Sequence, residues 1–520
     1  MLWGTRIANL RLYQRPLFTV LNNLRVELRL LSLSEPQVSN STSLSARLLS
    51  VPIVLNPTTC EGFSSFSSFY CQQPNGEDSC SLDEDCNDFL PWLEQKAGVK
   101  ISSVLSIGKS AHGRSLLASK TIQTGDFTLK VPYSVQITPD NLLPEIKHLL
   151  GDEVGNIAKL AVVILVEQKL GQKSEWAPYI SRLPQPGEMH NTIFWSKDEL
   201  EMINQSSVYQ ETLNLKSEIE KDFLAVKPAL QRIPELLGDV TYKDFMHACA
   251  LVGSRAWGST KGLSLIPLAD FLNHDGASES VVLSDEDRQV SEVIADRNYD
   301  PGEQVLIRYG KFPNGTLMLD FGFSLPYNIH DQVQIQFNIP RHDVLYERKI
   351  ELLQRHRIPI IKDVDFNSSV ESFTIKEVRS AKGKGKGLPQ SLRAFARVLS
   401  CITPEELGDL ALEAAQNDGR LARRPLTDRS REILAHEILL LRITQLMEEY
   451  DAAIKSLAPV RSPLPKCETL AFRSQMAQDL LNGELRILKS ASAWLKNYCA
   501  TLTTRNYHWE DVENFRTSPG

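Results

Sequence analysis

The stretch that decides the fold is GSRAWGSTKGLSLIPLADFLNHDGASES (residues 253–280), followed after a polar segment by DPGEQVLIRYGKFPNGTLMLDFGF (residues 300–323). In its first part, residues 263–272 are apolar at all but two positions, and Pro267 lies in the middle. Because proline interrupts a helix, this part predicts a short strand and a tight turn that leaves Asn273 and His274 facing inward.

The second part predicts another short strand. Pro301-Gly302 is a turn signal, residues 304–309 have the length and composition of a buried strand, and Gly310 ends it. This strand closes on Tyr309, thirty-five residues after His274. The two parts together therefore place an amide, an imidazole and a phenol at strand ends.

These motifs carry a family resemblance. PLADFLNHD (267–275) resembles the asparagine-histidine motif of SET-domain methyltransferases, and GEQVLIRYG (302–310) with LDFGF (319–323) resembles the motif of their catalytic tyrosine. The preceding Ser254-Arg255-Ala256 and a long C-terminal extension narrow the match to the Rubisco large subunit methyltransferase family. The resemblance covers roughly residues 87–500.

The resemblance implies an α+β fold, with a β-rich SET core that contains a helical insert and is followed by an all-helical substrate-binding domain. It also implies S-adenosyl-L-methionine as the cofactor and a lysine of a protein as the acceptor. A free lysine has a pKa of about 10.4, so the acceptor must lose its proton in a dry channel before an in-line methyl transfer. This chemistry needs no metal.

By resemblance, Tyr309 is the catalytic residue and Arg255 pairs with the cofactor carboxylate, for which a planar guanidinium is well suited. Trp257 and Phe321 are expected to line the substrate channel. The expected cofactor-binding residues are His112, Gly113, Arg114, Arg255, Asp270, Asn273, His274, Tyr309 and Asn314.

The sequence departs from the family pattern at three places. Ser115 stands where the second glycine of a Gly-x-Gly cofactor loop is expected, Phe321 replaces a tyrosine, and Pro313-Asn314-Gly315 keeps only the asparagine of Ser-Asn-Ala. These changes favour a non-catalytic SET-like binding module as the alternative function. Histidine methylation is a closer variant of the main hypothesis, because some relatives of this group perform it.

A third hypothesis is a metal-dependent hydrolase that uses Asn273-His274-Asp275 with His247 or His330. Adjacent ligands on one turn are poor metal geometry, and no second pair of ligands recurs at helical spacing. The eight cysteines include no CxxC pair, which argues against a zinc site. We therefore expect no metal.

Composition excludes other classes of protein. The chain has 520 residues, 42% hydrophobic and 23% charged, as in ordinary soluble globular proteins. A net charge of −7 argues against nucleic-acid binding, and no apolar run is long enough for a membrane helix. We expect a monomer whose partner is a protein substrate.

Residues 1–85 differ from the rest and predict an organellar transit peptide or a disordered leader. The first fifty residues are rich in arginine, serine and leucine and contain only two acidic residues, Glu27 and Glu35. The family resemblance points to the chloroplast, while the early arginines would suit a mitochondrion equally.

The remaining chain divides into a SET domain (86–330, with the insert at about 140–246), a helical domain (331–505) and a tail (506–520). The run KGKGKG at 382–387 predicts a flexible basic loop that cannot pack a core; it would either touch an acidic substrate or be solvated. Strands are expected at 101–107, 115–118, 127–131 and 333–339, and helices at 87–97, 157–170, 197–221, 242–252, 341–357, 390–402, 404–416, 430–450 and 471–502.

Overall fold

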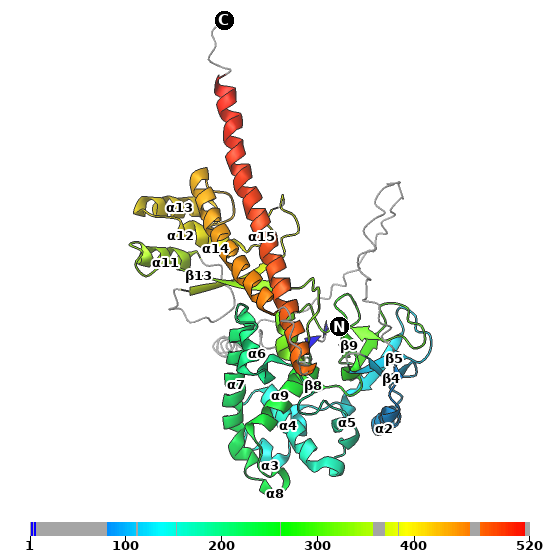
Figure 1. Ribbon diagram of the computed structural model, residues 1–520. Coiled ribbons are helices and arrows are strands. Elements are labelled where there is room, and N and C mark those ends of the chain that lie inside the picture. The colour runs from blue at the N-terminus through cyan, green and yellow to red at the C-terminus, as the bar shows by residue number, and fades with distance from the viewer. Residues whose placement is uncertain are drawn as a thin grey trace, which may run out of the picture.

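The computed structural model describes residues 2–3, 5–6, 81–110, 113–151, 153–259, 262–356, 370–382, 384–457 and 468–514. Figure 1 shows a lower lobe of small sheets with packed helices and an upper lobe that is mainly helical. The long helix α15 (Glu468–Asn514) runs through both lobes. The predicted α+β fold class is confirmed.

Small antiparallel sheets form the β-rich core of the lower lobe. Strands β3 (Ser81–Leu82), β4 (Leu105–Ser110) and β5 (Gly113–Ala118) make one sheet. A second has the order β1 (Leu2–Trp3), β10 (Val282–Asp285), β11 (Val290–Ile294) and β6 (Phe127–Pro132). A third has the order β2 (Thr5–Arg6), β7 (Ala256–Ser259) and β8 (Gly262–Leu265).

The start of the folded core corrects the sequence analysis. β3 pairs with β4 through Ser81↔Lys109 and Leu82↔Gly108, so the core begins at or before Ser81 rather than at residue 86. The pairing of β1 and β2 also places four residues of the leader within sheets. The transit-peptide prediction concerns mainly residues 7–80, which lie outside the described residues.

Helices fill the insert, as expected. The predicted buried helix is α4 (Asn156–Leu170), whose residues 158 and 160–166 are all buried because the helix is apolar on most sides. Around it lie α2 (Phe89–Ala97), α3 (Pro144–Lys147), α5 (Ala177–Ile180), α6 (Lys197–Glu201), α7 (Ser207–Leu230), α8 (Pro234–Leu237) and α9 (Tyr242–Arg255).

The single helix predicted at 197–221 is wrong. Ser196 and Glu199 form the predicted capping box and open α6, but the chain then turns. Ser206 accepts a hydrogen bond from the Val208 backbone NH and begins α7 as a second helix. The second cap is what divides the helix.

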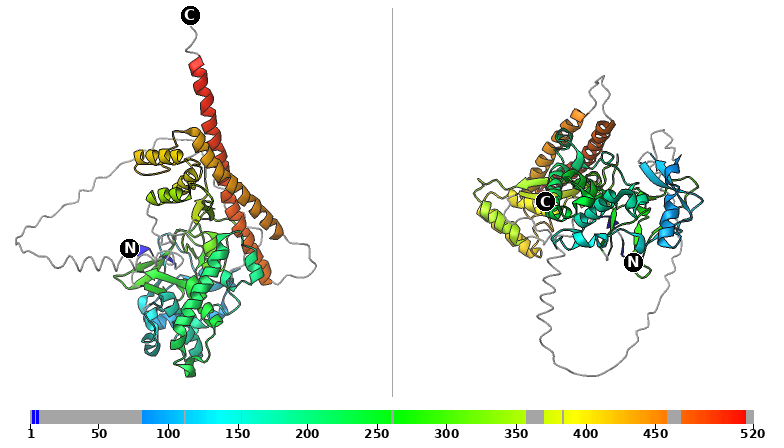
Figure 2. Two further views of the ribbon diagram at one scale, coloured as in Figure 1. Left: turned by 90° about the vertical axis from the view of Figure 1, so that its left-hand side faces the viewer. Right: turned by 90° about the horizontal axis from the view of Figure 1, so that it is seen from below.

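The upper lobe contains α11 (Tyr346–Arg355), α12 (Gln390–Leu399), α13 (Pro404–Gln416) and α14 (Arg429–Leu457). Figure 2 shows α14 crossing α15, against which it packs. The prediction of an all-helical domain needs one correction, because β13 (Gln332–Asn338) pairs with β14 (Val370–Lys376) in an antiparallel ladder. The predicted tail is also partly helical, since α15 continues to Asn514.

The prediction that residues 382–387 cannot pack a core is wrong for one of them. Gly385 is buried against the ring of Trp494, a core residue of the upper lobe. Its lysine neighbours Lys384 and Lys386 are exposed. Lys384 and Lys386 are therefore presented on either side of a packed glycine.

A buried carboxyl group joins the two lobes. Glu484 on α15 accepts a hydrogen bond from the Ser206 hydroxyl at 2.9 Å and lies 2.8 Å from the Tyr450 hydroxyl, which also lies 2.9 Å from the Gln205 carbonyl oxygen. Burial raises the pKa of Glu484 to about 8, and the charges of Asp331 and Glu211 act in the same direction. A protonated Glu484 can donate to Tyr450, which frees the Tyr450 proton for Gln205.

We expect this group to make stability depend on pH. Between about pH 4.5 and 8 an unfolded chain has lost the proton that folded Glu484 keeps, so the free energy of unfolding falls as pH rises through this window. Glu484→Gln mimics the protonated group, and its melting temperature should exceed that of the unsubstituted protein at pH 8 and equal it at pH 5. Differential scanning calorimetry from pH 5 to 9 measures this, and a constant difference across the range would contradict the assignment.

Candidate active site

Two very short parallel strands bring the predicted site together. β9 (Asn273–His274) pairs with β12 (Leu306–Ile307), and the Asp275 backbone NH donates to the Ile307 carbonyl oxygen at 3.0 Å. The predicted strand at 304–309 is thus reduced to two residues. The chain reaches β9 through a 3-10 turn (Ala269–Phe271), and buried Leu268 before it has a φ of 72°, a strained value for leucine.

Tyr309 follows β12 and is held by two hydrogen bonds. Its hydroxyl donates to the Leu272 carbonyl oxygen at 2.7 Å, and its backbone NH donates to Nδ1 of His274 at 3.1 Å. The side chain is 8% exposed. Because Nδ1 accepts this bond, the neutral imidazole carries its proton on Nε2. The structure thus joins Tyr309 and His274 as predicted.

Aromatic rings surround this tyrosine. The ring of His274 lies 5.0 Å from that of Tyr309, Phe321 lies at 5.2 Å and Phe323 at 6.4 Å. Phe321 ends a π-helix, η7 (Leu317–Phe321), and Gly322 follows with a φ of 79°. Phe321 and Phe323 therefore form an apolar surface beside the phenol, which we call the aromatic wall.

Arg255 and Asp270, both predicted to bind the cofactor, lie close together in the structure. Nε of Arg255 lies 3.8 Å from Oδ2 of Asp270, and the Arg255 side chain is 22% exposed while that of Asp270 is fully buried. Asp270 also accepts a hydrogen bond from the Tyr179 hydroxyl at 2.9 Å. The sequence analysis missed Tyr179, because it lies in an apolar insert segment that carries no motif.

The β4–β5 hairpin carries the predicted cofactor loop. Gly113 has a φ of 90°, which requires glycine, and the Asn273 amide donates to the Arg114 carbonyl oxygen at 3.3 Å. The Arg114 guanidinium bonds to Asp83 and to the Arg182 carbonyl oxygen. His112 lies outside the described residues.

Asp83 is a second residue that the sequence analysis missed, since it fell within the excluded leader. Burial opposes ionisation of this carboxyl, but hydrogen bonds from Lys109 and Cys86 and the positive charges of Lys109 and Arg114 lower its pKa. It is therefore charged and holds Arg114 at the loop.

Ser115, the first departure from the family pattern, is fully buried. It pairs with Gly108 across the hairpin, and its hydroxyl has no hydrogen-bond partner among the described residues. An unpaired buried hydroxyl costs about 1–3 kcal/mol. A buried polar group thus stands at the position where the family uses glycine.

The structure gives Asn314 a supporting role. Its amide nitrogen donates to the Leu325 carbonyl oxygen and its amide oxygen accepts from the Leu325 backbone NH, both at 2.9 Å. Both ends of the side chain are therefore engaged, which differs from the predicted cofactor contact. Trp257 is buried in β7 as part of the main core, so its place in the channel stays a prediction.

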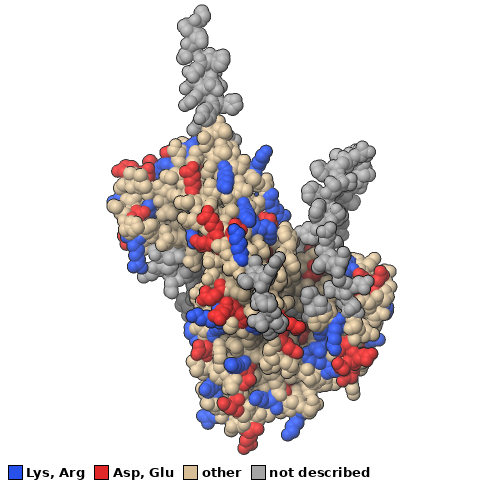
Figure 3. All heavy atoms as spheres, in the orientation of Figure 1, with Lys and Arg blue, Asp and Glu red and all other residues tan. Residues whose placement is uncertain are grey.

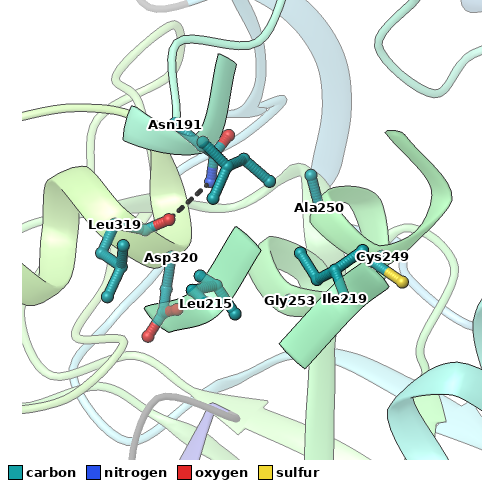
Figure 4. A pocket seen from close by; sticks show the side chains of 9 residues that line it. Asn191, Leu215, Ile219, Cys249, Ala250, Gly253, Leu319 and Asp320 are labelled. Carbon is teal, nitrogen blue, oxygen red and sulfur yellow. Dashed lines mark hydrogen bonds between the residues drawn. The ribbon is translucent and has the colours of Figure 1, made fainter. Parts of the chain in front are cut away.

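A small pocket with room for about one water molecule lies beside η7 (Figure 4). It is lined by residues of α7, α9 and η7, with Asn191 on one side. The Asn191 amide donates to the Leu319 carbonyl oxygen at 3.2 Å. Because Leu319 belongs to the π-helix that ends on Phe321, Asn191 supports the aromatic wall and is a third residue without a sequence signal.

The structure also bears on the hydrolase and membrane-protein hypotheses. Within the described ranges, the structure contains no group of three or more His, Cys, Asp or Glu side chains placed to hold a metal ion. His247, proposed in the hydrolase hypothesis, lies with Nε2 3.0 Å from the Pro184 carbonyl oxygen. None of the described helices combines the length and the apolar character that crossing a membrane requires.

The chain is similar to known protein methyltransferases. Residues 340–488 match the family model described as Rubisco LSMT substrate-binding, where LSMT is the large subunit methyltransferase. The actin-histidine N-methyltransferase of Papio anubis is 26% identical over 426 residues, which are 78% of this chain and 67% of that protein. The chloroplastic fructose-bisphosphate aldolase-lysine N-methyltransferase of Arabidopsis thaliana is 26% identical over 301 residues, which are 55% of this chain and 61% of that protein.

A solved structure shows the same fold. The SET domain of LSMT bound to lysine and AdoHcy aligns with a TM-score of 0.62 and 21% identity, covering 80% of this chain and 91% of the other. The predicted family recognition and SET-type architecture are confirmed.

The supporting role of Asn314 is testable. Asn314→Ala removes both partners of the half-buried NH and carbonyl groups of Leu325, and each lost hydrogen bond costs about 0.5–1.5 kcal/mol. We expect the melting temperature to fall by several degrees. The matched control is Asn338→Ala at an exposed position of β13, which should leave it unchanged. Equal melting temperatures for both variants would show that the Leu325 contacts contribute little.

Proposed function

We propose that this chain, which belongs to the Rubisco large subunit methyltransferase family of SET-domain proteins, is an S-adenosylmethionine-dependent protein-lysine N-methyltransferase. One observation carries the proposal: the β9–β12 pairing fixes Tyr309 against Leu272 and His274, beside an apolar wall.

The residues present fit the proposed cofactor. Among the described residues, and apart from its chain neighbours, no atom lies within 4 Å of the position where a side chain at Gly113 would start, which leaves bare backbone accessible. The partly exposed guanidinium of Arg255 is a polar group suited to the cofactor's amino-acid portion. When bound, S-adenosylmethionine supplies an electrophilic methyl group.

The chain's own residues would then orient and desolvate the acceptor. The Tyr309 hydroxyl donates its proton to the Leu272 carbonyl oxygen, which fixes the direction of the lone pairs on the phenol oxygen. These lone pairs can accept weak CH hydrogen bonds. Phe321 and Phe323 exclude water beside it, which disfavours an ammonium ion and so favours the neutral amine that attacks. Positioning and desolvation supply most of the rate in such a site.

The acceptor is proposed to be lysine because an aromatic wall without a hydroxyl at Phe321 suits an aliphatic stem. The same loss of a hydroxyl removes a hydrogen-bond partner for the amine, so we expect products with more than one methyl group. Histidine is the second candidate acceptor, because the actin-histidine methyltransferases are similar over a larger share of this chain.

The substrate is proposed to be a soluble protein of an organelle. The arginine-rich, acid-poor leader supports this location, and one similar relative is chloroplastic. The predicted monomeric state is also a proposal. The absence of a nucleic-acid partner is a further proposal, which the net charge of −7 supports.

Calorimetric titration of S-adenosylmethionine into the full chain tests the cofactor site. We expect micromolar binding, about −8 kcal/mol, that weakens at least tenfold in Arg255→Ala and is retained in Tyr309→Phe. The Tyr309 variant should instead lose about a hundredfold or more of the methyl transfer to proteins of a soluble extract, measured with labelled cofactor.

Thermal unfolding of both variants serves as the control for folding. If the unsubstituted, folded chain fails to bind S-adenosylmethionine, the catalytic proposal is excluded and the non-catalytic binding module takes its place.

A further inference from the structure

The lysine loop, by which we mean Lys382, Lys384, Gly385, Lys386 and Gly387, connects β14 to α12 and lies along α15. The Asn497 amide of α15 donates to the Ala381 carbonyl oxygen at 2.9 Å, and the Val378 backbone NH donates to the Ser490 hydroxyl at 3.0 Å. A backbone bond from Lys376 to Gly387, 2.9 Å long, closes the base. The loop is thus attached to the helix at several points.

The two glycines fix its conformation. Gly385 has a φ of 67°, and a side chain there would begin 2.6 Å from the ring of Trp494. Gly387 has a φ of 125°, and a side chain there would begin 2.5 Å from the Lys376 carbonyl oxygen. Trp494 is itself buried and stacked on Tyr498. Neither glycine position has room for a larger residue.

The three lysines are left exposed and unneutralised. Within the part of the chain that the structure describes, no carboxylate oxygen lies within 4.0 Å of the ammonium groups of Lys382, Lys384 or Lys386. The nearby Glu377 is already engaged, because Arg486 lies 2.7 Å from it. Figure 3 shows blue side chains gathered beside α15 in the upper lobe. This is a local positive surface on a chain of net charge −7.

The position of this surface relative to the active site follows from α15. The Ser324 hydroxyl, next to Phe323 of the aromatic wall, donates to Asp479 of α15 at 2.7 Å. Asp479 and Trp494 are fifteen positions apart on this helix, so the lysine loop stands about 22 Å along it from Ser324. An extended peptide of about six or seven residues spans that distance.

We infer that the lysine loop docks an acidic segment of the protein substrate while its target residue occupies the channel. This rests on the proposed function. It is supported by the fixed, unneutralised lysines and by the position of the loop within residues 340–488, the part that matches a substrate-binding domain. A nucleic acid is less well matched, because the acidic rest of the chain would repel it.

Fluorescence anisotropy with the full chain tests the inference in the absence of cofactor. The probe is a labelled peptide of four Glu-Gly repeats, compared with four Gln-Gly repeats and a single-stranded oligonucleotide at about 50 mM salt. We expect the acidic peptide to bind at least tenfold tighter than the neutral one. The combined variant Lys382→Glu, Lys384→Glu and Lys386→Glu should lose this preference.

The matched control is Lys120→Glu, Lys173→Glu and Lys221→Glu, which changes the net charge equally at exposed positions of the lower lobe. It should keep at least half of the preference. Equal losses in both variants would overturn the inference, as would loop-dependent binding of the oligonucleotide at similar affinity. Since S-adenosylmethionine binding is measured separately, a failed cofactor site and a failed docking surface are distinguished.

Discussion

The parallel pairing of β9 with β12 is the constraint on which the site depends. Each strand has two residues, so the pairing itself contributes few hydrogen bonds. The hydroxyl and backbone NH of Tyr309 extend the contact to Leu272 and His274, on either side of Asn273. The first of these bonds is buried and the second half-buried, so loss of either costs free energy, which makes one arrangement of this short segment more favourable than the others. The strained φ of Leu268 is maintained by the same packing.

The helical lobe supports this site from behind as well as offering a surface for a substrate. Met476 and Leu480 of α15 pack against Met318 of the π-helix, and Asp479 holds Ser324. Farther along the same helix, Arg486 lies 3.5 Å from Asp331, which in turn accepts the Asn314 backbone NH. Burial raises the pKa of Asp331 to about 6, since only part of that cost is offset by these partners. The aromatic wall is therefore set by contacts between the lobes, so a single helix links docking and chemistry.

The sequence allowed the fold class and the central motif to be predicted because both rest on local signals. Pro267, the apolar run before Asn273 and the glycine after Tyr309 mark short elements directly, and the capping box at Ser196 and Glu199 marks a helix start. Tyr179, Asp83 and Asn191 could not be found in this way, because each acts through a partner far away in the chain. The pairing of β14 with β13 and the packing of Gly385 on Trp494 are likewise long-range, and glycine-rich composition alone suggests a flexible loop.

The packing of the glycines explains why lysine and glycine alternate in the loop. A mobile loop would lose conformational freedom on binding, at about 1–2 kcal/mol for each backbone residue that becomes ordered. At Gly385 and Gly387 the backbone loses this conformational freedom during folding, because it packs against Trp494 and bonds to Lys376. An acidic partner would then gain favourable electrostatic energy from the three lysine charges, which no described carboxylate neutralises. The same sequence pattern that suggests a linker thus produces, on α15, a preorganised charged surface.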